Sequence, residues 1–574
     1  MSFQTLVNNL ITNTSDVSLP LFRPELIICA AIVVMLLVRL FRVGEKIDPF
    51  WFALIGVLIA FWCALPGGFP SNWSGVEPRQ IFTGMLIYDS MTVFFRMFLL
   101  AFAFWFIILV RMTGLADRQD GQDFYALLLG STLGMCLMAS ANHLMTIFLA
   151  VEMASVPSYV MAGIIKGRRR ASEAALKYAV YGAGAAGVML YGISLLAGLL
   201  GTAHLPTIAT RLVAMDIPTL VASGQNGGTL MVLVLAALMI MVGLAFKLSA
   251  VPFHFWCPDV FEGASAEVDA FLSVASKAAA MALLVRVALG VSAAASATSD
   301  AQVPLAQRTV PAQTVAFMQQ TESESSTGGD NTTAVDLAAS ADSLAPVRAF
   351  IVQLLAVIAA ITCTFGNLTA YGQTNIKRLL AYSTIAHAGY MMMAVAAAVH
   401  LAGTNATAAR DAVSALIFYL TAYVFMNLGA FAIIAFLRNT IGSEEIADYA
   451  GLIRSAPITS VALTMILVSL IGLPPLVGFF GKFYIFYALV VAGGPWMIGV
   501  LVIAGINTAI SLIYYLRVAK TVCIDPPPEN RGPVSIGLLP AAYVLAVSLP
   551  VLIYGIYPVP LTNIAVQATK HLFM

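Results

Sequence analysis

Charged side chains are scarce in this sequence. Only 10% of its 574 residues are Asp, Glu, Lys or Arg, and 60% are hydrophobic, whereas an ordinary soluble protein carries about 25% charged residues. The composition therefore excludes a soluble globular enzyme. An excess of one sign is lacking as well, because 29 basic residues stand against 28 acidic ones, so no nucleic-acid partner is expected.

Metal-binding patterns are also missing. The six cysteines stand alone, without a C-x-x-C pair or a His/Cys cluster at ligand spacing, so we expect no iron–sulfur or zinc site. The start of the chain lacks the basic region and cleavage site of a signal peptide, and we therefore expect the first apolar run to be kept as a span. His387 and His400 could suggest a haem, but no second helix offers opposing histidines.

Long apolar runs dominate what is present. A helix needs about 20 apolar residues to cross the hydrocarbon core, because backbone groups in lipid must be satisfied internally. Such runs lie at 24–42, 49–68, 86–110, 122–141, 144–165, 174–201, 229–261, 264–292, 348–371, 378–401, 411–437, 456–492, 495–518 and 535–557. The sequence thus predicts an all-α integral membrane protein of about fourteen transmembrane helices. The run G-A-G-A-A-G at 182–187 lies inside one of them, where small residues favour helix packing over a dinucleotide site.

The placement of Lys and Arg gives the orientation. Sixteen fall in the odd-numbered loops and seven on the opposite side, namely Arg23, Arg79, Arg211, Arg308, Arg348, Arg410 and Lys570. Cytoplasmic loops carry the excess of basic residues. We therefore expect a multi-pass membrane protein with the odd loops in the cytoplasm and both termini on the outer side.

One polar segment interrupts the apolar pattern. Residues 293–346 are rich in Ala, Ser, Thr, Gln and Asp, a composition that cannot bury a core, so we expect an extramembrane loop. The chain then divides into N-terminal helices one to three (1–120), a first repeat (121–292), this loop, a second repeat (347–520) and a C-terminal helix (521–574).

Six cations lie at or near membrane depth: Arg96, Lys177, Lys247, Lys277, Arg286 and Lys482. A charge at the bilayer centre costs roughly 2.5 to 3.5 kcal/mol, so such residues usually face a polar interior. Structural ion pairs can explain a single buried charge, and we assign Arg96, Arg286 and Asp89 such a role. Lys177 lies near a helix end, where it could equally reach the interface.

The seventh and twelfth spans are too long for one straight crossing. A helix over 456–492 would extend roughly 55 Å against a core of about 30 Å. Each contains helix breakers near its lysine: Pro252 in the seventh, and Pro474, Pro475, Gly478 and Gly481 in the twelfth. We predict discontinuous helices of opposite direction, within two inverted five-helix repeats made of helices 4–8 and 9–13.

Four stretches carry a family resemblance. They are L-K-Y-A-V-Y-G-A (176–183), F-K-L-S-A-V-P-F-H-F-W-C-P-D-V-F-E-G-A (246–264), N-I-K-R-L-L-A-Y-S-T-I-A-H-A-G-Y (375–390) and G-L-P-P-L-V-G-F-F-G-K-F (472–483). With them the chain resembles the antiporter-like membrane subunits shared by complex I and multisubunit sodium/proton antiporters. The motif P-D-V-F-E-G-A and the lysine in the twelfth helix are similar to the N-type subunit of bacterial NADH:quinone oxidoreductase.

This resemblance implies a set of proton-translocating residues. Glu152 and Lys247 match the family's coupling ion pair, Lys277 its connecting lysine and Lys482 its terminal proton donor. His254 and His387 match auxiliary polar positions beside that axis. The chain departs from the family's G-A-P-T with Gly263-Ala264-Ser265-Ala266, followed by Glu267 and Asp269, to which we assign no role.

By the same resemblance, the chain is expected to be a non-redox, proton-translocating subunit of NADH:quinone oxidoreductase. No cofactor is expected in this subunit, and NADH, FMN, iron–sulfur clusters and quinone would belong to the whole complex. The expected partners are M-type and K-type membrane neighbours and the lipid bilayer. A subunit of a sodium/proton antiporter or membrane-bound hydrogenase is an alternative, as is an autonomous solute carrier.

Overall fold

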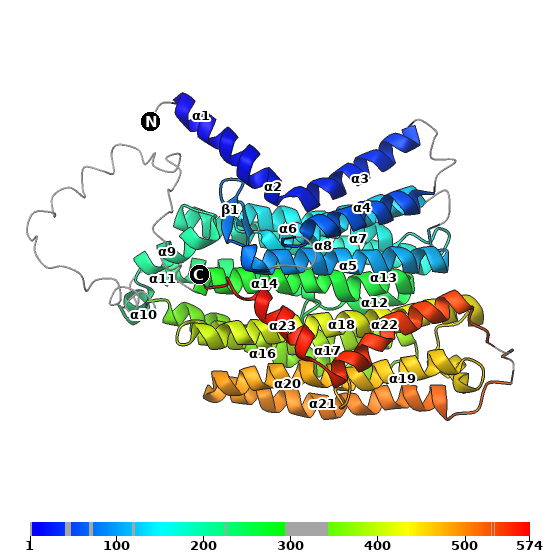
Figure 1. Ribbon diagram of the computed structural model, residues 1–574. Coiled ribbons are helices and arrows are strands. Elements are labelled where there is room, and N and C mark those ends of the chain that lie inside the picture. Colours follow the sequence, from blue (N-terminus) through cyan, green and yellow to red (C-terminus); the bar gives the residue numbers. More distant parts are fainter. Residues whose placement is uncertain are drawn as a thin grey trace, which may run out of the picture.

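Helices make up nearly all of the structure, a computed structural model that describes residues 3–40, 48–67, 73–116, 121–223, 227–292, 343–529, 531–532 and 534–573. Most of them run side by side along one direction (Figure 1). A helix bonds its own N–H and C=O groups, which suits an apolar surrounding. The predicted all-α membrane fold is confirmed, and the strands of the described part form one two-stranded hairpin, β1 (Arg79–Ile81) and β2 (Leu86–Tyr88).

The first three predicted spans correspond to α3 (Arg23–Leu40), α4 (Pro49–Ala64) and α5 (Ser90–Thr113). They are preceded by helices that the sequence did not predict: α1 (Phe3–Thr12), the π-helical segment η1 (Asn13–Ser18) and α2 (Leu19–Leu21). Residues 3–21 contain many Asn, Thr and Ser residues, so they do not form an apolar run. This arm bends sharply before α3.

The next spans are α6 (Gly121–Ser140), α7 (Leu144–Ala162) and α8 (Arg169–Leu200). Two short helices follow, α9 (Leu205–Ala214) and α10 (Ile217–Ser223). The second half contains α16 (Ala345–Ala370), α17 (Ile376–Ala402), α18 (Ala406–Ile441), α21 (Gly494–Cys523), α22 (Leu538–Ile556) and α23 (Val559–Ala568). Short 3-10 turns η3 (Trp73–Gly75), η7 (Ile446–Tyr449) and η8 (Leu452–Arg454) lie in connections.

Both predicted interruptions are present. The seventh span consists of α11 (Gly227–Leu248) and α12 (Trp256–Gly263), and the twelfth of α19 (Pro457–Ile471) and α20 (Val477–Ala492). Proline lacks the N–H that would continue the helix ladder, and Gly472 caps α19 with a left-handed φ of 92°. The eighth span is also irregular, because the π-helical turn η4 (Leu272–Ser276) joins α13 (Ala266–Phe271) to α14 (Lys277–Ser292).

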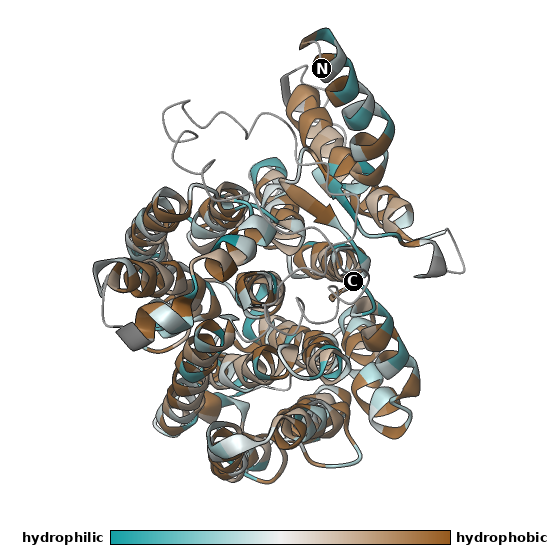
Figure 2. Ribbon diagram, turned by 90° about the vertical axis from the view of Figure 1, so that its left-hand side faces the viewer, coloured by the Kyte–Doolittle hydropathy of each residue, from teal (hydrophilic) through white to brown (hydrophobic). Residues whose placement is uncertain are grey.

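Helices α17 and α18 form the centre of the molecule. Each is 89% buried over its most apolar window, and α18 packs against α13, α17, α20 and α22. The outer helices expose large apolar side chains, among them Leu149, Leu176, Met231, Val502 and Ile506. Hydrophobic residues, drawn in brown, make up much of the outer helices in Figure 2. Such an extensive apolar surface fits a lipid surrounding.

The connections sort onto two ends of the bundle. One cavity is lined by residues 168–170, 262–263, 375, 438 and 442–445, so four odd-numbered loops meet at one end, which we name the odd face. At the other end, the even face, Leu86 bridges to Ala141 and His143 to His204. This alternation agrees with the predicted order of crossings.

The exact number of crossings stays a prediction. Eleven described helices are long and apolar enough to span alone, or up to twelve with the bent N-terminal pair. Helices α4, α19 and α20 have 15 or 16 residues each. The inverted repeats and the division of the chain also stay predictions, and residues 293–342 of the predicted loop lie outside the described part.

Candidate functional site

The six predicted deep cations separate into two groups. Arg96 pairs with Glu25 at 2.5 Å, Arg286 with Asp89 at 2.5 Å, and Lys177 with Asp259 at 2.7 Å. In the described part of the chain no carboxylate lies within ion-pair distance of the other three, Lys247, Lys277 and Lys482, although each is at least 96% buried. These three lysines are therefore set apart from the cations that hold helices together.

Lys247 lies in the last turn of α11, just before the helix break. Its amine has no hydrogen-bond partner among the described residues. The half-buried Glu152 on α7 interacts with it electrostatically. Helix α8 packs against both α7 and α11, the helices that carry the two side chains. The predicted pair is thus near enough to interact but is not closed into a salt bridge.

His254 lies in the break between α11 and α12. It is 3% exposed, and its ring packs against the Phe365 ring of α16 at 4.4 Å between centroids. The Val251 N–H donates to Thr362 of α16 at 3.0 Å. The break is therefore anchored on the second half of the chain.

Lys277 is the first residue of α14 and follows the π-helical turn η4 directly. It is 2% exposed, and its amine is another without a hydrogen-bond partner in the described chain. Single π-helical turns within a helix often occur at functional sites. The buried Cys257 of α12 is its electrostatic neighbour.

Lys482 is held differently. Its Nζ donates to the carbonyl of Ile471 at 2.9 Å and lies 4.5 Å from the centre of the Tyr390 ring. Ile471 is the last residue of α19, so the broken helix directs the negative end of its dipole at the amine. Gly478 permits the approach of α20 to α19, since a Cβ there would lie 1.9 Å from the Ser469 carbonyl oxygen, and Gly481 permits the approach to α18, since a Cβ there would lie 2.2 Å from Tyr419.

His387 on α17 connects the two halves. It interacts electrostatically with both Lys277 and Lys482. Its Nδ1 is hydrogen-bonded to the Tyr419 hydroxyl at 2.5 Å and its Nε2 to the Tyr515 hydroxyl at 3.1 Å. The sequence did not predict either tyrosine, because 19 tyrosines are present and neither stands in a distinctive pattern.

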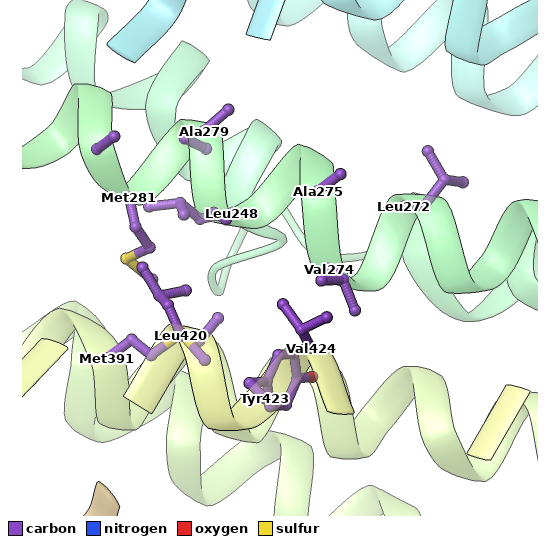
Figure 3. Close-up of a cluster of buried hydrophobic side chains, with 14 of the residues drawn as sticks. Leu248, Leu272, Val274, Ala275, Ala279, Met281, Met391, Leu420, Tyr423 and Val424 are labelled. Atoms are coloured by element: carbon purple, nitrogen blue, oxygen red, sulfur yellow. The ribbon is translucent and has the colours of Figure 1, made fainter. Parts of the chain in front are cut away.

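Apolar side chains fill the space between these groups. Figure 3 shows the side chains that face one another where α11, η4 and α14 meet α17 and α18, among them Leu248, Val274, Met281, Met391, Leu420, Tyr423 and Val424. Within the described residues, no hydrogen bond joins any two of Glu152, Lys247, Lys277 and Lys482. The ionisable groups are thus separated from one another by mainly apolar side chains.

Comparison with known proteins identifies the family. The family described as NADH:quinone oxidoreductase/Mrp antiporter, TM, matches residues 141–309 and 333–508. The chain belongs to this family. The matched residues contain all six predicted site residues of this antiporter-like chain.

Individual relatives are similar over most of their length. The chain is 38% identical to NADH-quinone oxidoreductase subunit N of Anaeromyxobacter sp. (strain Fw109-5), over 85% of each chain. It is 33% identical to subunit N 2 of Chloroherpeton thalassium, over 96% of this chain and 94% of the relative. Among solved structures, a chain of respiratory complex I from Thermus thermophilus with bound Aureothin superimposes with a TM-score of 0.67 and 29% identity, over 95% of this antiporter-like chain and 99% of that one.

Proposed function

We propose that this chain is the N-type membrane-arm subunit of an NADH:quinone oxidoreductase and that it moves protons without redox chemistry of its own. The observation that carries the proposal is the group of three buried lysines, each beside an irregular helix and without a carboxylate of the described residues in ion-pair distance. An ion pair that only holds helices together would be closed, as those of Arg96 and Arg286 are.

The proposed mechanism uses electrostatics. A nearby carboxylate stabilises a lysine's charged form, whereas a poorly hydrated surrounding favours its neutral form. When Glu152 approaches Lys247, the lysine binds a proton, and when Glu152 withdraws, the proton is released toward Lys277. His387 then relays it toward Lys482, because it interacts with both lysines. Water entering the apolar gaps would bridge the distances between the groups.

The surrounding assembly is part of the proposal. NADH oxidation, FMN, iron–sulfur clusters and quinone belong to other subunits, and this chain counts as a subunit of a translocase. Its neighbours are M-type and K-type membrane subunits in a bacterial inner membrane, with both termini on the periplasmic side. The relatives named as NADH-quinone oxidoreductase subunit N support this assignment over an antiporter subunit.

The test uses the assembled complex in membrane vesicles. Lys247→Ala and Glu152→Gln should lower the protons pumped per NADH oxidised, since a positioned acid–base group contributes on the order of 10²-fold or more to a proton transfer. Lys520→Ala is the control, because this lysine is exposed and pairs with Asp525 near a helix end. Normal pumping by both variants would refute the proposal, and pumping that requires sodium would favour the antiporter alternative.

A further inference from the structure

A second group of buried charges lies at the odd-face end of the bundle, where α13 begins. Glu267 and Asp269 are both 0% exposed, and none of their four carboxylate oxygens has a hydrogen-bond partner in the described chain. Buried carboxylates are normally paired or hydrogen-bonded. These two acids, which stand where the sequence departs from its family, therefore need a functional explanation.

The neighbours do not neutralise them. Asp269 interacts electrostatically with Lys377, Glu444, Glu267 and Arg438. The charge of Lys377 is balanced by Glu444, because its Nζ lies 3.0 Å from that carboxylate and also donates to the Ala264 carbonyl at 2.7 Å. Arg438 is then the remaining cation for the two carboxylates of Glu267 and Asp269. The group carries one excess negative charge, which a single bound proton would balance.

Solvent reaches the edge of this group. Arg438 and Glu444 line a cavity of about 430 Å³ on the odd face, whose rim carries Arg168, Arg169 and Arg170. The three rim arginines have exposed side chains. Water in this cavity can therefore contact two of the residues that surround Asp269.

Two serines lie in the chain between Asp269 and Lys277. Ser273 and Ser276 belong to the π-helical turn η4, which joins α13 to Lys277 at the start of α14. Both serines are buried, and Ser276 immediately precedes Lys277. The buried Cys257 interacts electrostatically with both Asp269 and Lys277, so one thiol lies within electrostatic range of both groups.

From these observations we propose that Glu267 and Asp269 form a proton-loading site, which takes up a proton through the odd-face cavity and passes it to Lys277. In the transfer, the O–H bond of the carboxylic acid breaks and an N–H bond forms on the lysine amine, which leaves a carboxylate and an ammonium. The inference rests on the proposed function, because it supplies the proton that Lys277 moves onward.

The test compares variants in the purified and vesicle-reconstituted complex. Glu267→Gln together with Asp269→Asn keeps the side-chain shapes and removes both acids, whereas Glu529→Gln makes the same kind of change at an exposed acid that does not line the cavity. The double variant should pump fewer protons per NADH oxidised, and Glu529→Gln should pump normally. Asp269→Glu keeps a carboxyl at this position and should therefore pump more protons than the double variant. A purely structural role would not require this difference between the two variants.

A second measurement detects the proton itself. Redox-induced infrared difference spectra should contain a protonated-carboxyl band that disappears in the double variant and stays in Glu529→Gln. Should the double variant not assemble, Ser276→Ala tests the route instead and should slow proton transfer. Normal pumping and an unchanged infrared band in the double variant would refute the proton-loading site. The proposed function is tested separately by Lys247→Ala. Loss of pumping in Lys247→Ala with normal pumping in the double variant leaves the function standing and refutes this inference.

Discussion

The three buried lysines differ in how their amines are held. Lys482 is bonded to a helix-end carbonyl and lies over an aromatic ring, whereas Lys247 and Lys277 have no hydrogen-bond partner among the described residues. A charged amine without a partner is costly in an apolar interior, and a neutral one is tolerated more easily. The three amines thus lie in two different hydrogen-bonding environments.

The hydrogen bond between His387 and Tyr419 provides a residue-scale prediction. Tyr419→Phe removes one partner of the imidazole, and a single hydrogen bond contributes about 1 kcal/mol, roughly a fivefold effect. We expect the complex to assemble and proton pumping to slow by about that factor. Tyr371→Phe is the matched control, because its hydroxyl donates to Ile510 away from His387. Equal pumping rates in vesicles from the two variants would show that His387 does not take part in the proton relay.

At the scale of elements, the broken helices depend on close backbone approach. A Cβ on Gly478 would lie 1.9 Å from the Ser469 carbonyl oxygen, so a side chain there forces α20 away from α19. Overpacking of this kind typically costs about 1–3 kcal/mol. We predict that Gly478→Ala lowers the thermal midpoint and proton pumping together. Gly499→Ala should change neither, because nothing lies within 4 Å of a Cβ at that position of α21; equal behaviour of the two variants would contradict the packing explanation.

Three even-face connections meet at His204. Asn142 donates from its side-chain amide to His204 Nε2 at 3.0 Å and to the Gly84 carbonyl at 3.2 Å. The His204 ring must be neutral to accept this bond. Burial, with a smaller contribution from His143, lowers the pKa of His204 below its usual value.

This arrangement predicts a pH dependence. Because the folded pKa is depressed, the folded state binds fewer protons than the unfolded state, so stability is full at neutral pH and falls as the pH drops below the ordinary histidine value. The thermal midpoint of the wild type should fall more between neutral and mildly acidic pH than that of His204→Gln, which does not titrate. Identical pH profiles would show that His204 does not hold these loops.

Much of the element pattern could be predicted from the sequence, because apolar length and helix breakers act locally. The two interruptions follow from Pro252 and Pro474, and helices lie over every predicted span. The π-helical turn before Lys277 and the helices α1, α9 and α23 were missed, since they depend on packing or on amphipathic surfaces rather than on long apolar runs. At the site, the lysines are conspicuous in an apolar sequence, whereas Tyr419 and Tyr515 become meaningful only through their contacts with His387.

At the scale of the whole molecule, the two faces differ in composition. The odd face gathers Arg168, Arg169, Arg170, Arg378 and Arg438 around acidic partners. The even face carries the β-hairpin, and histidines join its loops. The start of α1 and the end of α23 both lie toward the same end of the bundle as the hairpin (Figure 1), as an even number of crossings requires. The excess of basic residues predicts that the odd face lies in the cytoplasm.

Site-directed cysteines test this orientation with two matched changes. Glu445→Cys places a thiol on the odd face and Glu77→Cys places one beside the even-face hairpin, and both glutamates are exposed. A membrane-impermeant maleimide added to intact spheroplasts should label Glu77→Cys and not Glu445→Cys, and inside-out vesicles should give the reverse. The wild type reports any background from exposed Cys63. Labelling of Glu445→Cys in intact spheroplasts would show that the protein has the opposite orientation in the membrane. The proposed proton-loading cavity would then open to the periplasm instead of the cytoplasm.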